Sequence, residues 1–130
     1  MKNILFTLAL VVSFSFLSHS QMKILVNNGE EIVYYESGEV KYKANYLDGR
    51  LQGEKTGYYK SGEVEYKMTY VDDLKQGEEI AYYEFGDVKY VVKSKGNYVD
   101  GKKQGEEIAY YENGEIKEIQ NYKDGELIED

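Results

Sequence analysis

The segment Tyr34-Tyr35-Glu36-Ser37-Gly38-Glu39-Val40 is followed along the chain by three close copies of itself. These copies are Tyr58-Tyr59-Lys60-Ser61-Gly62-Glu63-Val64, Tyr82-Tyr83-Glu84-Phe85-Gly86-Asp87-Val88 and Tyr110-Tyr111-Glu112-Asn113-Gly114-Glu115-Ile116. Successive copies begin 24, 24 and 28 residues apart. A period of this size indicates a repeat protein, in which one small structural unit is stacked on copies of itself.

Each unit has the pattern of a β-hairpin. In the first unit, residues 30–36 and 39–46 are rich in Tyr, Val and Ile, and Ser37-Gly38 separates them. Two such runs around a glycine-containing dipeptide predict a hairpin with a two-residue turn, and Asn113-Gly114 is the strongest example, typical of a type I′ turn. The next turn carries Asp-Gly in three units and Asp72-Asp73 in one, where Asp73 replaces glycine because Asp tolerates the left-handed conformation. The prediction is an all-β fold, an elongated antiparallel β-meander of stacked hairpin repeats.

The predicted turn also sets which residues share a face of the sheet. With Ser37-Gly38 as the loop, Tyr35 faces Val40, and directly paired residues lie on the same side. Further pairs then place a small residue against a larger one: Val33 with Tyr42, Gly57 with Tyr66 and Ala81 with Tyr90. We expect this face, with the strand-end residues Tyr46, Tyr70, Tyr98 and Tyr122, to be the packed side.

The opposite face carries one tyrosine per repeat: Tyr34, Tyr58, Tyr82 and Tyr110. We call these four residues the tyrosine ribbon. Two hypotheses fit it. Its rings either shield a solvated sheet, or they form a row of contacts for an extended partner.

The third repeat is four residues longer than the first two. The extra length is assigned to residues 91–97, which contain Lys93 and Lys95. A projecting loop on a rigid scaffold often carries specificity, whereas an insertion can also be neutral. The loop hypothesis makes Lys93 and Lys95 candidate binding residues, alongside the tyrosine ribbon.

The first twenty residues have the pattern of a secretory signal peptide. Lys2 is followed by an apolar run over residues 4–17 and by the small-residue site Ser18-His19-Ser20. The run is too short for a stable membrane span. We therefore expect cleavage near Ser20-Gln21, a secreted or periplasmic protein, and one domain over residues 21–130 with four repeats at about 29–126.

Composition narrows the function. Removing residues 1–20 takes away one Lys, the only His and no acid, which leaves 15 basic and 24 acidic residues and a net charge of −9. Such a surface repels nucleic acid and anionic lipid, and it favours a basic partner. Without His or Cys there is no imidazole base, thiolate or soft metal site, so no metal, cofactor or catalytic residue is expected. Acidic pairs such as Glu112 and Glu115 flank the tight turns, where solvated charge is a simpler explanation than acid–base catalysis or Ca²⁺ binding.

These residues carry a resemblance to a known family. The run Asn45-Tyr46-Leu47-Asp48-Gly49-Arg50-Leu51-Gln52-Gly53-Glu54, followed by Tyr58-Tyr59, resembles a MORN repeat, and most closely its bacterial variant with Y-x-D-G, then G-E, then Y-Y-x-x-G. Residues 98–106 match best, and the resemblance spans about residues 29–126. It implies a twisted meander with one hairpin per repeat, contacts with proteins, oligomers or lipid, and no catalytic residues. Some bacterial members are labelled antitoxins.

The functional hypothesis that follows is a non-enzymatic, exported module that binds a protein or peptide. Two alternatives stay open. One is an antitoxin-like neutraliser of a toxin, and the other is a glycan-binding module, because sugars stack on aromatic rings.

Overall fold

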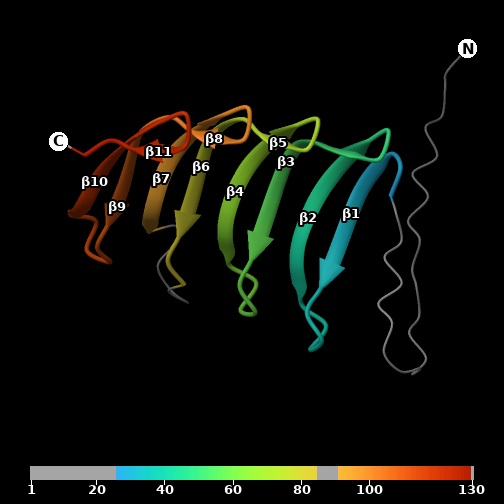
Figure 1. Cartoon of the computed structure of the whole chain (residues 1–130). Helices are drawn as coiled ribbons and strands as arrows, with labels where there is room; N and C mark the ends of the chain where they lie inside the picture. The colour runs from blue at the N-terminus through green and yellow to red at the C-terminus, as the bar shows by residue number, and fades with distance from the viewer. Residues whose placement is uncertain (1–25, 85–90, 130) are drawn as a thin grey trace, which may run out of the picture.

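The computed structural model describes residues 26–84 and 91–129, and within them the chain consists of strands and turns without a helix. The predicted signal peptide lies outside these residues. Eleven strands in this part of the chain form one antiparallel sheet, with the hairpins side by side in a row (Figure 1). The strands are β1 (Gly29–Tyr34), β2 (Val40–Leu47), β3 (Arg50–Tyr58), β4 (Val64–Val71), β5 (Leu74–Lys75), β6 (Gly77–Tyr82), β7 (Val92–Val99), β8 (Lys102–Lys103), β9 (Gly105–Tyr110), β10 (Ile116–Lys123) and β11 (Glu126–Leu127). The predicted all-β meander is confirmed.

The turns that join one repeat to the next follow the prediction. Asp48 and Gly49 have φ values of 50° and 74°, and they connect the paired residues Leu47 and Arg50. Two consecutive positive φ angles define a type I′ turn, whose twist matches that of the strands. Asp72 and Asp73 adopt the same conformation, with φ values of 49° and 69°. Asp73 therefore does replace the turn glycine.

The turns inside the hairpins differ from the prediction. Tyr34, not Tyr35, pairs with Val40, and the register shifts between Val33 and Tyr34. The Gly38 N–H donates to the Tyr35 carbonyl at 3.0 Å, and the Tyr35 N–H donates to the Glu39 carbonyl at 2.8 Å. The loop therefore has three residues, with only its glycine at positive φ. This is the other common way to join two strands, a type I turn followed by a bulge.

The same correction applies to the last hairpin. Gly114 has a φ of 84°, while Asn113 is not among the residues at positive φ, so this turn is not type I′. Asn113 instead accepts a hydrogen bond from the Glu115 N–H through Oδ1 at 3.0 Å. Its side chain therefore stabilises the three-residue loop to which Asn113 belongs.

The extra length of the third repeat does not project where the sequence placed it. Lys93, Lys95 and Asn97 lie inside β7, where Lys95 pairs with Ile80 and Asn97 pairs with Glu78. The four added residues fall instead in the hairpin connection between Tyr83 and Val91, most of which lies outside the described residues. The expected pair of Ala81 with Tyr90 is replaced by Ala81 with Ser94. The prediction failed because it aligned Tyr90 with Tyr66, whereas the hydrogen-bond ladder aligns Val92 with Val64.

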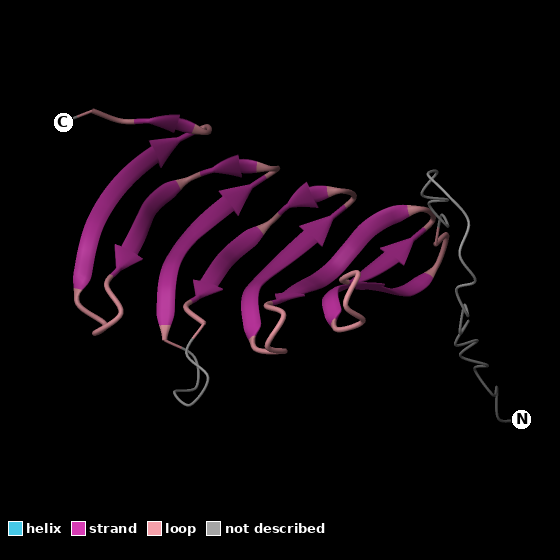
Figure 2. Cartoon of the chain, turned by 90° about the horizontal axis from the view of Figure 1, so that it is seen from below, coloured by secondary structure: helices cyan, strands magenta, loops and turns pink. Residues whose placement is uncertain are grey.

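The sheet bends along a line of glycines. Gly29, Gly53, Gly77 and Gly105 all have positive φ, and a Cβ atom at these positions would meet nothing within 4 Å. Glycine is therefore required by the backbone conformation and not by lack of space. Figure 2 shows that the strands are bowed in the same direction.

Lys75 and Glu79 identify the inner side of the bend. Four residues of extended chain span about 13 Å. The Lys75 ammonium nevertheless lies 3.0 Å from the Glu79 carboxylate, as expected where the chain folds toward these two side chains. We call the side of the sheet that carries Lys75 and Glu79 the concave face, and the opposite side the convex face.

Neighbouring repeats are joined by two ladders of side-chain hydrogen bonds. Along one border, the Tyr35 hydroxyl donates to the Tyr58 carbonyl at 2.7 Å, and Tyr59 does the same to Tyr82 at 2.8 Å. Along the other border, the Asp72 N–H donates to the Gln52 side-chain oxygen at 3.0 Å. Equivalent bonds recur at Asn28, Gln76 and Gln104. Each repeat is thus fixed to the one before it and the one after it.

Buried side chains are few, as expected for a single-layer sheet. Ala44 is fully buried and Met68 is 2 % exposed, and both lie on the face predicted to be packed. Gly57 pairs with Tyr66 on that face, as predicted. Thr56 is also buried, although it points to the convex face, where its hydroxyl donates to Glu54 at 2.9 Å.

Candidate binding surface

The concave face carries a row of tyrosines opposite the bend glycines. The pairs are Gly29 with Tyr46, Gly53 with Tyr70, Gly77 with Tyr98 and Gly105 with Tyr122. Each ring thus faces a glycine, which has no side chain. We call the concave face along this row the trough, and the four rings Tyr46, Tyr70, Tyr98 and Tyr122 its floor. Repeat stacking gives this floor a regular spacing, and such extended concave surfaces are typical binding sites of repeat proteins.

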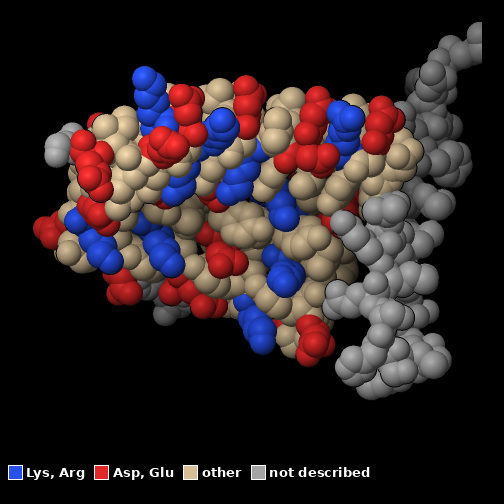
Figure 3. Space-filling model, viewed as in Figure 1, with Lys and Arg blue, Asp and Glu red and all other residues tan. Residues whose placement is uncertain are grey.

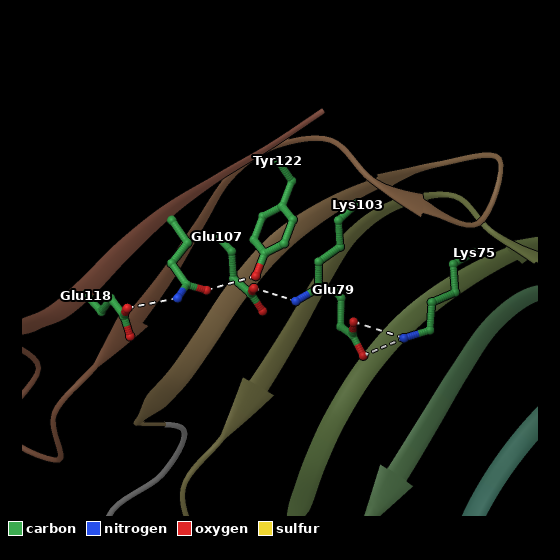
Figure 4. Close-up of polar contacts among 7 residues, drawn as sticks. Lys75, Glu79, Lys103, Glu107, Glu118 and Tyr122 are labelled. Atoms are coloured by element: carbon green, nitrogen blue, oxygen red, sulfur yellow. Dashed lines mark hydrogen bonds and ion pairs between the residues drawn. The ribbon is translucent and has the colours of Figure 1, made fainter. Parts of the chain in front are cut away.

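Ion pairs alternate with these rings. Lys75 contacts Glu79 at 3.0 Å and Lys103 contacts Glu107, and all four side chains are about 70 % buried (Figure 4). The same ammonium groups lie over tyrosine rings, with Lys75 at 4.6 Å from the centroid of Tyr98 and Lys103 at 4.7 Å from that of Tyr122. Partial burial strengthens such contacts relative to those on an open surface.

The first repeats use the same residue types in another arrangement. The Glu31 carboxylate accepts hydrogen bonds from Tyr42 at 3.1 Å and from Tyr46 at 3.2 Å. Lys55 lies 4.1 Å above the Tyr42 ring without a carboxylate within ion-pair distance among the described residues. Burial lowers the pKa of Lys55, although Glu31 opposes that effect.

The protonation of the concave tyrosines is shifted by this environment. Burial, together with the charge and hydrogen bond of Glu31, raises the pKa of Tyr42 to about 12. Burial also raises the pKa of Tyr66, Tyr70 and Tyr98, with Glu79 adding to the effect at Tyr98. These hydroxyls therefore stay neutral donors at any physiological pH.

The tyrosine ribbon lies at the strand ends near the hairpin turns. Tyr34 is 56 % exposed at the end of the row, whereas Tyr58, Tyr82 and Tyr110 are half-buried. The backbone carbonyls of Tyr58 and Tyr82 accept the hydrogen bonds from the Tyr35 and Tyr59 hydroxyls described above. Lys93 and Lys95 do not form a separate loop beside the ribbon, because both belong to β7.

A shallow hollow with a volume of about 250 Å³ lies on the convex face near the third repeat. Lys95 lines it together with Glu78, Glu106 and Ile108. Figure 3, drawn from the direction of Figure 1, shows the other side of the molecule, over which basic and acidic side chains are interspersed. The charged surface seen there is mixed, without one extended patch of a single sign.

The acidic pairs at the hairpin turns remain exposed. Glu36, Glu39, Glu112 and Glu115 are all exposed, and a hydrogen bond from Ser37 contributes most to a lowered pKa at Glu39. No group of three or more acidic or histidine side chains in the described residues is arranged to hold a metal ion. A further acidic pair in the sequence is Glu84 and Asp87, of which Asp87 lies outside the described residues.

Sequence reasoning missed the ion pairs on the concave face. Lys75 and Glu79 are four residues apart. In a flat strand this spacing predicts no ion pair, because the Cα atoms of residues i and i+4 are about 13 Å apart. The signal was present in Gly77, a glycine between two charged residues inside a strand pattern, since such a glycine often marks a bend or bulge. Gly105 between Lys103 and Glu107 repeats that signal.

A single-layer sheet of stacked hairpins with a repeated aromatic floor defines a β-repeat module. A family model described as a MORN repeat variant matches residues 27–48, 51–72 and 103–124, about half of the chain. The chain belongs to the MORN repeat variant family, as its sequence predicted. MORN repeats are commonly modules that bind proteins or membranes, and they are not a known enzyme family. The unmatched third repeat forms the same hairpin from β6 and β7, with its added residues in the turn.

No curated protein matches the chain. In the described part of the chain, no helix is long and apolar enough to cross a membrane.

Proposed function

We propose that the protein is a non-enzymatic, exported interaction module that binds an extended segment of a protein along its concave trough. The observation that carries this proposal is the row Tyr46, Tyr70, Tyr98 and Tyr122, one ring per repeat along the bend. Tyrosine is a favoured residue at interface hot spots because it buries a large area at low entropic cost. A partner strand lying across the repeats would meet equivalent rings in succession.

The side chains of the trough are held in place before a partner arrives, which favours binding to the trough. Its hydroxyls, carboxylates and ammonium groups bond one another across and along strands. Side chains held in place before binding lose less entropy when the partner arrives. Net acidity of the mature chain favours a basic partner, and it raises the rate of encounter with one.

Glycan binding has weaker support on this face. A sugar stacks on the open face of an aromatic ring, but Lys75 and Lys103 each lie over one ring of the floor, and Lys55 lies over the Tyr42 ring on the same face of the sheet. An antitoxin-like role is a special case of protein binding, in which the partner is a toxin.

The test begins with capture of the partner from the cell envelope or the culture medium of the natural host. The captured partner is then titrated with Tyr70→Ser, on the trough floor, and with Tyr58→Ser, on the tyrosine ribbon. We expect Tyr70→Ser to weaken binding at least tenfold and Tyr58→Ser to change it less than threefold. Circular dichroism of both variants establishes that the sheet is retained.

Other results would redirect the assignment. Loss with Tyr58→Ser alone would transfer the site to the tyrosine ribbon. Loss with Lys93→Ser and Lys95→Ser, together with weakening at high salt, would assign it to the start of β7. Unchanged affinity in all of these variants would remove both faces as contact surfaces.

A further inference from the structure

One position of the trough carries the opposite charge in the second repeat. The residues three places before each tyrosine of the tyrosine ribbon are Glu31, Lys55, Glu79 and Glu107. They lie in β1, β3, β6 and β9, and the first two both pair with Ala44, so they share its face of the sheet. Lysine therefore replaces a carboxylate at one of four equivalent positions.

Lys55 has no acidic partner, unlike the other lysines of the trough. The two lysine–glutamate ion pairs in Figure 4 each join residues four apart. Lys55 occupies the glutamate position of such a pair, and the lysine position is taken by Leu51. Glu31 lies two strands away and accepts hydrogen bonds from Tyr42 and Tyr46. Burial of the uncompensated ammonium lowers the pKa of Lys55.

Four tyrosines surround Lys55. Its direct partners across the strands are Ala44 in β2 and Met68 in β4, and both are buried. The residues two places before and after these partners lie on the same face: Tyr42, Tyr46, Tyr66 and Tyr70. Such diagonal neighbours are about 7–8 Å apart, within reach of aromatic and long side chains. Lys55 therefore lies at the centre of an aromatic site on the concave face.

Three hydrogen-bond donors in this site lack an acceptor. Among the described residues, the Lys55 ammonium and the hydroxyls of Tyr66 and Tyr70 have no acceptor within hydrogen-bond distance. The Tyr66 ring extends over Gly57 of β3, the strand that carries Lys55. Glu79 is the acid that acts on both hydroxyls, but it is already held in an ion pair. We call Lys55, Tyr66 and Tyr70 the donor cluster.

We propose that the donor cluster binds an aspartate or glutamate side chain of the extended partner, an inference that rests on the proposed function of the trough. Hydrogen bonds between an ammonium and a carboxylate are among the strong ones in proteins. A single negative charge suits the site, because the double charge of a phosphate would be repelled more strongly by Glu31 and Glu79 on either side. The trough continues past Lys55 in both directions, so the partner reaches the site with a side chain and not with its terminus. A partner that is basic overall can carry one such acid.

The donor cluster would also fix where the partner lies along the trough. The floor presents an equivalent ring in every repeat, so the floor alone allows a partner to slip by one repeat. Neighbouring repeats are two strands apart, about 9.5 Å, which an extended chain covers in about three residues. A slip of that size would move the acid from Lys55 to Glu31 or Glu79, where like charges repel.

Selection from a library of displayed peptides tests the proposal with the protein in its naturally processed form. Peptides of about twelve residues span four repeats at three residues each. We expect the natural protein to retain peptides that share one acidic residue. Lys55→Gln should lose this preference, and Lys55→Glu, which installs the residue of the other repeats, should select a basic residue instead. Lys43→Gln removes the same charge from the convex face and is the matched control, and circular dichroism establishes that each variant retains the sheet.

Affinities of the selected peptides test the site directly. The peptides are synthesised with amidated C-termini, which removes the terminal carboxylate. Changing the shared acid to its amide should weaken binding to the natural protein about tenfold, as expected for a hydrogen bond to a charged group, and binding to Lys55→Gln less than about twofold. A second acid three residues from the first should weaken binding, because it would face Glu31 or Glu79.

The outcomes separate this inference from the proposed function. Peptides retained without a shared acid, or an equal loss in the natural protein and Lys55→Gln, would overturn the carboxylate site and leave the trough as a peptide-binding surface. Loss of binding on amidation would overturn the side-chain assignment in favour of a chain terminus. If the natural protein retains no peptide, the proposed function and this inference both fail.

Discussion

Tyr66 lies directly across from Gly57, and its ring occupies the space where a side chain at position 57 would be. A Cβ atom built on Gly57 would be 2.2 Å from Tyr66 Cε1 and 2.5 Å from Cζ. Gly57 is buried, and its φ is not in the left-handed region. Glycine is therefore required here for space, in contrast to the bend glycines, which are required for conformation.

Gly57→Ala should destabilise the sheet by about 1–3 kcal/mol, the usual cost of overpacking, because the Tyr66 ring must move. Gly96→Ala is the matched control. It is also a strand glycine without positive φ, but a Cβ there would meet Glu107 at an ordinary 3.6 Å. Urea unfolding followed by circular dichroism measures both, and equal midpoints would contradict the close contact.

Tyr66→Ala should destabilise more than Tyr58→Ala. Removal of the Tyr66 ring leaves a gap that Gly57 has no side chain to fill, whereas Tyr58 lies at a strand end. Losing a fully buried aromatic costs about 3–5 kcal/mol, so a half-buried ring should cost about half of that. Urea melts of the two variants decide the order, and the reverse order would mean that the convex face is the packed one.

Tyr59→Phe should cost about 1 kcal/mol, the typical net value of one hydrogen bond, because the Tyr82 carbonyl loses its donor. Tyr111→Phe is the control, since its hydroxyl has no acceptor among the described residues and removing it should leave stability unchanged. Thermal unfolding of both variants gives the comparison. A similar loss in both would show that the hydroxyl ladder does not stabilise the stack.

Stability should fall at alkaline pH. Burial and Glu31 raise the pKa of Tyr42 in the folded chain to about 12, while an unfolded tyrosine titrates near 10. The folded state therefore binds the proton more tightly. Its advantage is complete below about pH 10 and is lost as the pH rises towards 12.

The measurement is the urea midpoint between pH 9 and pH 12, with tyrosinate absorbance recorded in parallel. Tyr42→Phe should lessen the decline, because the group that titrates is removed. Tyr34→Phe, a change at the most exposed tyrosine of the ribbon, should not. A decline that is identical in both variants would assign the alkaline sensitivity to other groups.

The mature protein should begin at or near Gln21 and be found outside the cytoplasm. The short apolar run and the site Ser18-His19-Ser20 motivate this expectation. Mass spectrometry of the protein from fractionated host cells provides the test. An intact N-terminus in the cytosolic fraction would exclude export.

The repeat period predicted the fold because every unit contains its own strand and turn residues. The Asp turns need only local chemistry, so even Asp72-Asp73 could be assigned from its residue types. The pair of Gly57 with Tyr66 followed from strand alternation. What could not be predicted depended on hydrogen-bond register. A bulge shifts Tyr34 into the place expected for Tyr35, and no residue type distinguishes a two-residue loop from a three-residue loop when glycine suits both.

The position of the insertion shows the same difficulty. Tyr90 and Val92 both offer plausible matches to the earlier repeats, and only the ladder between β6 and β7 decides between them. The trough could be predicted in part. Strand alternation placed its tyrosines on one face, but Lys75 and Glu79 meet across a bend at Gly77, whose positive φ is not fixed by residue type alone.

The ladders between repeats also bear on how the chain acquires its structure. Each Asp turn binds a side chain that was synthesised 20 to 24 residues earlier: Asn28, Gln52, Gln76 or Gln104. A chain that emerges with its N-terminus first therefore always finds the acceptor already in place. Repeats can fold one after another as they appear, since none has to wait for a distant segment, and a chain threaded through a narrow pore could fold progressively on the far side.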